Sequence, residues 1–256
     1  GTFTVCAVLD AEGRIASIAK SFSTPPDFSQ GVIAVLELAA ESLGLSGQAL
    51  LAQTALFIHG CTVATNAMIE RTGARTGVLT TRGHEDALFI GNVVQKVAGL
   101  AEREIIHQSR LRKAEPPIVD RLNVKGIPER IDALGRIVVA LDEAGARQAI
   151  RELVDAGVAS VAISFLWSFL NDTHERRVKA MLRAAAPDVL VFASSEVAPV
   201  LGEYERTVTT ALNAYLGPPV IAYAHRLQDT LRKLGYERDL LFSHCLGGLT
   251  TLGEVE

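Results

Sequence analysis

The stretch that most constrains this fold is residues 55–81, where strand and helix signals alternate around a polar turn. An apolar run leads into residues 59–62, His-Gly-Cys-Thr, where the backbone must turn. Residues 63–71 then carry apolar side chains at helical spacing, and residues 76–80 are again rich in β-forming types. The stretch predicts a strand, a helix and a second strand, that is, a βαβ unit.

Four polar side chains in this unit are candidate site residues: His59, Thr62, Thr65 and Asn66. They lie at the carboxyl end of the first strand and the start of the helix, where free N–H groups and the helix dipole favour an anion or a polarised oxygen. In open α/β sheets this edge is the usual ligand site. Two ordinary alternatives stay open: His59 as a satisfied core histidine, and helix capping as the role of one hydroxyl or amide.

The same residues carry a resemblance to a known family. Residues 59–91 read HGCTVATNAMIERTGARTGVLTTRGHEDALFIG, which resembles the block HGTTVATNAxxERxGAxTxLxTTxGFxDxLxIG of the hydantoinase A, 5-oxoprolinase and acetone carboxylase superfamily. Three further blocks are similar: SFLWSFLNDTHERRV at 164–178, SSEVAPVLGEYERTVTTALNAYLGP at 194–218, and a looser FSHCLGGL at 242–249. The resemblance implies an α/β fold with an actin-like ATPase (ribonuclease-H-like) domain, followed by a second α/β unit.

By this resemblance, the chemistry couples ATP, with Mg²⁺, to attack on an unreactive carbonyl compound. Hydantoinases and oxoprolinases phosphorylate an amide oxygen so that water opens a ring, and ketone carboxylases activate bicarbonate, a ketone enolate or both. Phosphoryl transfer needs positioning and charge neutralisation rather than a protein nucleophile. The expected roles are catalytic for His59 and Thr62 and substrate-binding for Thr65 and Asn66, with no protein metal ligand named and a partner subunit of the hydantoinase B type.

Residues 92–121 distinguish the branches of the family. Hydantoinases and oxoprolinases resemble one another in a GxQxRPxxxDL segment, whereas this chain lacks the Arg-Pro pair and looks more like the ketone carboxylase branch. The first hypothesis is therefore a nucleotide-binding subunit of an ATP-dependent ketone carboxylase of the acetone or acetophenone type. The alternatives are an ATP-dependent cyclic amide hydrolase (N-methylhydantoinase or 5-oxoprolinase) and a non-catalytic scaffold subunit; a variable surface loop would also explain the segment.

The first residues resemble the tail of the family's phosphate loop, DxGGTFTD. The resemblance implies that Gly1, Thr2 and Thr4 contact nucleotide phosphates through backbone N–H groups and hydroxyls. Val5 stands where the family has Asp, and a plain first strand is the alternative. The resemblance also implies a chain truncated at both ends.

Composition excludes several classes of function. The 256 residues are 48% hydrophobic with a formal net charge of −4, which gives no reason to expect a nucleic acid or an anionic membrane as partner. No apolar run approaches the roughly 20 residues of a spanning helix. Three widely spaced cysteines argue against a disulfide framework and favour a reducing cytoplasm.

The remaining chain predicts further α/β structure. We expect a hairpin at 2–22, paired edge to edge with the strand at 55–58, and a helix capped by Asp27 or Ser29. Strands and helices alternate over 142–193, and residues 202–216 and 218–234 read as two helices. Glu203 to Arg206 read as a helix face with salt bridges. The predicted domains are 1–140, actin-like, and 141–256, the start of the hydantoinase A core.

Overall fold

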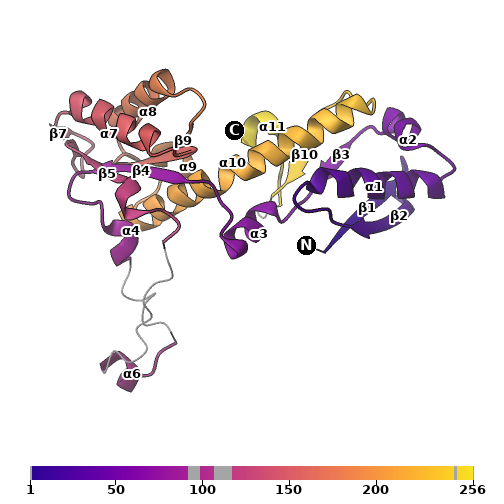
Figure 1. Cartoon of the computed structure of the whole chain (residues 1–256), viewed down its shortest axis with the longest axis horizontal. Helices are drawn as coiled ribbons and strands as arrows, with labels where there is room; N and C mark the ends of the chain where they lie inside the picture. Colours follow the sequence, from indigo (N-terminus) through magenta and orange to yellow (C-terminus); the bar gives the residue numbers. More distant parts are fainter. Residues whose placement is uncertain (1, 92–98, 107–116, 245–246, 256) are drawn as a thin grey trace. The chain divides into compact units, whose positions relative to one another are not determined.

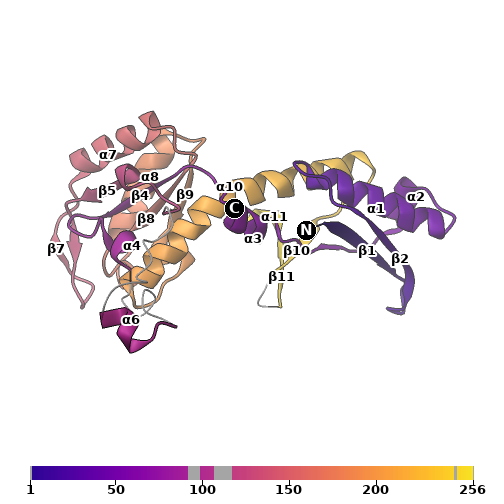
Figure 2. The same cartoon turned by 60° about the horizontal axis from the view of Figure 1, so that its bottom comes forward.

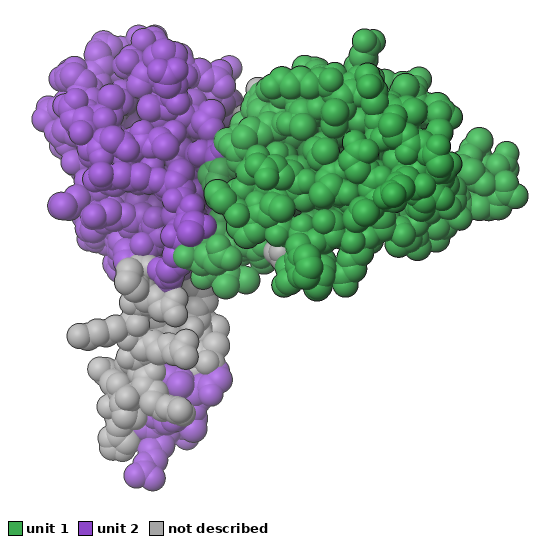
Figure 3. All heavy atoms as spheres, turned by 45° about the vertical axis from the view of Figure 1, so that its right-hand side comes forward, with its two compact units in different colours: residues 1–70, 219–256 green, residues 71–218 purple. Residues whose placement is uncertain are grey.

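The computed structural model describes residues 2–91, 99–106, 117–244 and 247–255 (Figure 1). The chain forms two compact units, coloured separately in Figure 3: Gly1–Glu70 with Pro219–Glu256 as unit 1, and Arg71–Pro218 as unit 2. Both mix helices and strands, so the predicted α/β class is confirmed. The units divide the chain at other points than the predicted division after residue 140, because strands on both sides of that residue share one sheet.

Unit 1 contains a hairpin and a second small sheet. Its elements are β1 (Phe3–Leu9), β2 (Ile15–Phe22), α1 (Phe28–Ser42), α2 (Gly47–Gln53), β3 (Phe57–His59), α3 (Val63–Glu70), β10 (Leu240–Ser243), β11 (Leu249–Thr251) and α11 (Leu252–Val255). The hairpin is antiparallel, as predicted, and α1 lies along one of its faces in both views (Figures 1 and 2). The second sheet has the order β11-β10-β3, with β3 parallel to β10.

The predicted pairing of the hairpin with the strand after residue 55 is wrong for the part of the chain that the structure describes. There β1 pairs with β2 alone, and β3 pairs with β10. Strand β10, with the sequence Leu-Leu-Phe-Ser, forms the hydrogen bonds with β3 that the hairpin was expected to form. The facing sides of β1 and β3 line a cavity instead.

The core of unit 1 forms between α1 and the C-terminal half of α10 (Glu203–Lys233). Asp27 caps α1 by accepting a hydrogen bond from the Ser29 amide, as predicted. One face of α1 is buried, and its residues Val32 and Leu36 share a cluster with Leu227 of α10. Hydrophobic burial on one face of α1 therefore fixes the helix against α10.

Unit 2 is a parallel four-stranded sheet covered on both faces, with the strand order β5-β4-β8-β9. Its elements are β4 (Thr76–Thr81), α4 (Ala87–Ile90), α6 (Glu102–Ile106), η1 (Arg121–Asn123), β5 (Val124–Ile127), β6 (Arg130–Ile131), β7 (Ile137–Val139), α7 (Glu143–Asp155), β8 (Ser160–Ser164), α8 (Thr173–Ala185), β9 (Leu190–Ala193) and α9 (Ser194–Val197). Helices α7 and α8 cover one face, and Ala211 and Ala214 of α10 pack on the other. This double cover explains why β4 and β8 are buried along their whole length.

The predicted βαβ unit is wrong in its pairing, although its three elements exist. Strand β3 belongs to unit 1, whereas β4 lies in the sheet of unit 2, between β5 and β8. Both edges of β4 are therefore occupied by parallel neighbours, and no edge is left for β3. Local periodicity predicted the elements, but it carries no information about which strands share a sheet.

The two helices expected at 202–216 and 218–234 are one helix, α10, of 31 residues. It runs through Gly217, Pro218 and Pro219, and the boundary between the units falls between the two prolines. Proline has the φ angle that a helix needs, but it lacks the N–H donor and its ring crowds the carbonyl group four residues earlier. Burial of apolar side chains on both sides of the prolines offsets those lost hydrogen bonds.

One finding concerns membranes. Over the described ranges, no single helix is long and apolar enough to cross a membrane, and only the pair α1 and α2, bent by 86°, meets that length and composition together.

Candidate functional site

A cavity of about 1470 Å³ lies within unit 1. Its walls come from β1 on one side and from β3 with the turn to α3 on the other, and α1 and α2 contribute Val32, Val35, Leu36 and Leu50. Most of the cavity is therefore apolar. One part is polar, because the turn after β3 adds hydroxyl, imidazole and amide groups.

The structure brings most of the predicted site residues onto this one cavity. The predicted residues that line it are Thr4, His59, Thr62, Thr65 and Asn66. Thr2 is described but does not line the cavity, and Gly1 lies outside the described residues. Hydroxyl, amide and imidazole donors thus converge from two segments that are more than fifty residues apart in sequence.

In the turn between β3 and α3, the glycine at position 60 lies close to the side chain of Ser243 on β10. A Cβ atom there would lie 2.8 Å from Oγ of Ser243, closer than real Cβ contacts come. Behind this turn, α3 begins where the amide of Asn66 donates to the carbonyl oxygen of Thr62, at 2.8 Å. Gly60 therefore lets β3 and β10 stay close while the chain turns and presents Thr62, Thr65 and Asn66.

The side chain of His59 is held by residues from the C-terminal part of the chain. Its Nε2 lies 2.8 Å from the hydroxyl of Tyr223, and its ring also packs against Tyr223 and, edge-on, against Phe242. Burial lowers the pKa of His59 to about 4, so the imidazole is neutral near pH 7. Burial, followed by the nearby Cys61, raises the pKa of Tyr223 above its usual range, so its hydroxyl keeps its proton.

Tyr223 and Ser243 are two cavity residues that sequence reasoning missed. Nothing at the sequence level connects Tyr223 with His59, which lies 164 residues away. Ser243 ends β10, which lies near β3 only because the two strands, far apart in sequence, pair in the folded chain. Among the described residues, no group of three or more His, Cys, Asp or Glu side chains could hold a metal ion.

The donors of the cavity suit phosphate oxygens better than a cation. Thr62, Thr65 and Asn66 carry hydroxyl or amide N–H groups, and phosphate oxygens accept hydrogen bonds from such donors. Mg²⁺ needs carboxylate or phosphate oxygens, and Asp10 is the acidic side chain on the described lining. Asp10 already bonds Arg14 at 2.8 Å. The described lining thus fits a phosphate-bearing compound and provides no protein ligand set for Mg²⁺.

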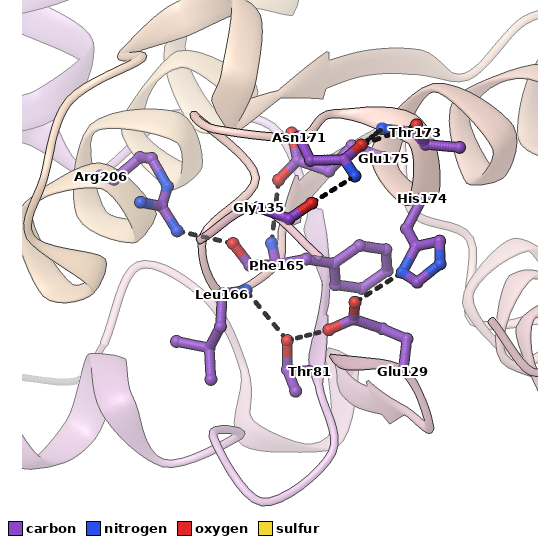
Figure 4. A network of polar contacts seen from close by, with 10 residues as sticks. All are labelled: Thr81, Glu129, Gly135, Phe165, Leu166, Asn171, Thr173, His174, Glu175 and Arg206. Carbon is purple, nitrogen blue, oxygen red and sulfur yellow. Dashed lines mark hydrogen bonds and ion pairs between the residues drawn. The ribbon is translucent and has the colours of Figure 1, made fainter. Parts of the chain in front are cut away.

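Unit 2 holds a second polar cluster, at the carboxyl ends of its parallel strands (Figure 4). Nδ1 of His174 lies 2.8 Å from the buried carboxylate of Glu129, whose other oxygen accepts a hydrogen bond from Thr81. The hydroxyl of Thr81 in turn accepts the amide of Leu166 at 3.0 Å. This chain of bonds ties the end of β4 to α8 and to the segment after β8.

Glu175 and Arg206 form the other half of the cluster. The carboxylate of Glu175 accepts the amide of Phe165 at 2.8 Å and the hydroxyl of Ser194 at 2.6 Å. The guanidinium of Arg206 donates to the carbonyl oxygen of Phe165 at 2.6 Å, to Ser194 and to the carbonyl oxygen of Val200. The prediction that Glu203 to Arg206 form a helix face with salt bridges is wrong for Arg206, because this residue is only 1% exposed.

The contacts of the polar cluster in unit 2 indicate that it stabilises the fold. Each carboxylate oxygen of Glu129 and Glu175 accepts at least one hydrogen bond from the protein, and the three nitrogens of Arg206 all donate to protein oxygens. Burial lowers the pKa of Arg206, while the charge of Glu175 opposes that shift. Groups already saturated by protein partners hold strand ends in place rather than receive a ligand.

Comparison with known proteins now identifies the family. Residues 1–186 match the family described as the hydantoinase/oxoprolinase N-terminal region. This chain belongs to the hydantoinase/oxoprolinase family. The resemblance read from the sequence blocks is thereby confirmed.

Two curated members of the family illustrate its range. The chain is 38% identical over 256 residues to the acetophenone carboxylase gamma subunit of Aromatoleum aromaticum, a match that covers 97% of this chain and 34% of the relative. It is also 38% identical over 252 residues to the caprolactamase subunit alpha of Pseudomonas jessenii, covering 97% of this chain and 35% of the relative. The chain spans about a third of the length of these relatives.

A solved structure of a family member agrees with the fold. A chain of nucleotide-free acetone carboxylase, from a study of ATP-dependent acetone carboxylation, superposes with a TM-score of 0.88 at 31% identity, covering 100% of this chain and 36% of that chain. The actin-like ATPase type of fold that the resemblance implied is therefore confirmed. The branch-specific segment at 92–121 lies largely outside the described residues, which omit 92–98 and 107–116.

Proposed function

We propose that this chain is the nucleotide-using part of an ATP-dependent enzyme that activates an unreactive carbonyl compound by phosphorylation. The observation that carries the proposal is the cavity of unit 1, where Thr4, His59, Thr62, Thr65 and Asn66 converge. A phosphoryl group would move from ATP to an oxygen of the carbonyl compound, leaving ADP. In amide hydrolysis water would then add to the activated carbon, and the phosphorylated oxygen would leave as phosphate. In ketone carboxylation the phosphoryl group would pass on to bicarbonate, which would break down to phosphate and carbon dioxide, and the enolate carbon would bond to that carbon dioxide while the ketone keeps its oxygen. Preorganised neutral donors suit this chemistry, because they stabilise charge on phosphate oxygens without moving.

The first candidate reaction is carboxylation of a ketone of the acetone or acetophenone type with bicarbonate. Supporting it are the identity to an acetophenone carboxylase subunit, the likeness to an acetone carboxylase structure and the absence of the Arg-Pro pair in residues 92–121. In this role the protein works with a partner subunit of the hydantoinase B type. The relatives support a multi-subunit enzyme, since the acetophenone carboxylase and caprolactamase matches are both subunits.

The second candidate is hydrolysis of a cyclic amide, such as a lactam, a hydantoin or 5-oxoproline. Its specific support is the caprolactamase subunit, which matches this chain at the same identity as the acetophenone carboxylase subunit. The scaffold alternative, a subunit that keeps the fold without using ATP, rests on Val5 at the family's Asp position and on the fit of the described cavity lining to phosphate but not to Mg²⁺.

One assay separates the three. ADP release is measured for the protein, with and without its partner subunits, in the presence of Mg-ATP and either acetophenone plus bicarbonate, acetone plus bicarbonate, caprolactam, hydantoin or 5-oxoproline. Ketone-dependent turnover that requires bicarbonate supports the carboxylase, and amide-dependent turnover without bicarbonate supports the hydrolase. A fully assembled protein that neither binds nor hydrolyses ATP is the scaffold.

A further inference from the structure

The ring of His59 has one nitrogen in a protein hydrogen bond and one nitrogen without such a bond. Nε2 lies 2.8 Å from the hydroxyl of Tyr223. Over the described ranges Nδ1 has no hydrogen-bond partner. His59 is only partly buried and lines the cavity of unit 1, so the exposed part of the residue faces that cavity.

The protonation of this pair follows from the partners available to each atom. If Nε2 carried the proton and donated to Tyr223, the hydroxyl hydrogen of Tyr223 would need another acceptor. The structure shows no other hydrogen bond of that hydroxyl in the residues it describes. Tyr223 also borders the cavity, but it is only 3% exposed, whereas His59 is partly exposed. A buried donor without an acceptor is costly. If Tyr223 donates to Nε2 instead, every donor of the pair either has an acceptor or faces the cavity.

The surroundings keep both groups neutral. The rings of Tyr223 and Phe242 pack against His59, with centroids 5.7 Å and 6.0 Å away, and remove water from two sides of the imidazole. The charged or titratable groups that act on Tyr223 are Cys61, Asp27 and Arg226, on the turn, the α1 cap and α10. Burial is the cause of the lowered pKa of His59, and no charged neighbour opposes it.

We propose that Tyr223 is a positioning residue whose hydroxyl donates to Nε2 of His59 and thereby fixes a neutral imidazole with its Nδ1–H directed into the cavity. There the Nδ1–H donates to an oxygen of the bound compound, beside the hydroxyls of Thr62 and Thr65 and the amide of Asn66. The cavity thus selects compounds that present acceptor oxygens, such as a phosphate or a carbonyl. The identity of the compound rests on the proposed function, whereas the protonation of the ring does not.

Nuclear magnetic resonance of the unliganded chain tests the protonation. Long-range proton–nitrogen correlation between pH 6 and 8 should show His59 with an unprotonated Nε2 and a protonated Nδ1. In Tyr223→Phe the His59 signals should change to a mixture of both tautomers, because the donor to Nε2 is lost. The control is Tyr236→Phe, which removes another buried hydroxyl bonded to β3, at the amide of Phe57, and should leave the tautomer unchanged. An Nε2-protonated ring in the unmodified chain, or a Tyr223→Phe chain with unchanged tautomer, overturns the proposal.

Ligand titration tests the second half of the proposal. Inorganic phosphate, caprolactam and acetophenone are added separately while the His59 ring signals are followed. A shift with phosphate alone assigns the acceptor as a phosphate oxygen, and a shift with either carbonyl compound alone assigns a carbonyl oxygen. Saturating additions of all three that leave the Nδ1 signal unmoved overturn the role of Nδ1 as a donor to ligand.

In turnover assays, Tyr223→Phe should lower kcat about tenfold, as expected for loss of one hydrogen bond, with little change in KM. The double variant with His59→Ala should be no worse than His59→Ala alone, because Tyr223 acts through His59. Fully additive losses contradict a positioning role. If no variant and no unmodified protein uses ATP, the proposed function fails while the tautomer result stands.

Discussion

The imidazole of His174 lies 2.8 Å from the carboxylate of Glu129, and both side chains are almost completely removed from solvent. The pair joins the start of α8 to the segment after β5, two elements that are 45 residues apart. It also reaches β4, because the second oxygen of Glu129 accepts the hydroxyl of Thr81. One carboxylate thus connects three elements of unit 2.

We expect Glu129→Ala to destabilise the protein by about 3–5 kcal/mol, because it leaves both His174 and Thr81 buried without their partner. Glu129→Gln keeps the shape and one acceptor oxygen and should cost less. Urea denaturation followed by circular dichroism measures both. The matched control is Arg176→Ala, which removes an exposed partner of Asp172 and should leave the midpoint nearly unchanged. Equal midpoints for all three variants would contradict the role of Glu129.

Arg206 should tolerate no replacement that lacks its planar fork. Its three nitrogens reach Ser194, Val200 and Phe165 at once. Arg206→Lys keeps the charge but cannot bond all three, so we expect a loss of stability of at least about 2 kcal/mol, close to that of Arg206→Met. Thermal unfolding measures the loss, and a stable lysine variant would show that charge alone suffices.

Gly73 is expected to resist substitution because of the ring of Tyr215. A Cβ atom at position 73 would lie 2.2 Å from that ring. Tyr215 is buried, and its carbonyl oxygen accepts a hydrogen bond from the amide of Ala74. Gly73→Ala should cost about 1–3 kcal/mol from overpacking. Gly253→Ala is the control, since no atom lies within 4 Å of the added methyl group. Differential scanning calorimetry compares the two, and a neutral Gly73→Ala would be inconsistent with the fixed position of Tyr215.

His59 should make stability depend on pH. Its pKa is lowered to about 4 in the folded chain from 6.5, so between these values the unfolded chain binds more protons. The free energy of unfolding therefore rises with pH from about 4 to 6.5, and His59 alone accounts for about 3 kcal/mol of that rise. His59→Phe should flatten the rise when unfolding is measured in urea at pH 4, 5, 6 and 7. The same slope in the variant would assign the dependence to other groups.

Activity tests the polar part of the cavity. Removing one preorganised contact typically costs about 10²–10³ in rate, so Thr62→Val and Asn66→Leu should each lower ATP-coupled turnover by that order. Gln53→Ala is the matched control, since Gln53 lines the apolar part and its amide donates to Ala49 on its own helix. Its turnover should be normal. Equal losses in all three variants would indicate damage to the fold rather than to the site.

Residues 55–81 show how much of the fold could be predicted from the sequence. Apolar periodicity and the polar turn placed β3, α3 and β4 within a few residues, because these signals are local to each element. The same reasoning assigned both strands to one sheet, and this was wrong, since pairing depends on strands β10, β5 and β8 far away in sequence. The prolines at 218 and 219 led to the wrong prediction of two helices. Burial against other elements, which the local sequence does not show, keeps α10 continuous.

The α/β class, the family and the polar residues of the turn after β3 could be predicted from the sequence alone, because they depend on residue types at short spacing. His59, Thr62, Thr65 and Asn66 share one turn and one helix start, so they could be grouped without a structure. Only the tertiary structure decided that Tyr223 bonds His59 and that Arg206 is buried. The reason is physical: a side chain's burial, hydrogen-bond partner and pKa are set by what packs against it, and those neighbours come from distant parts of the chain.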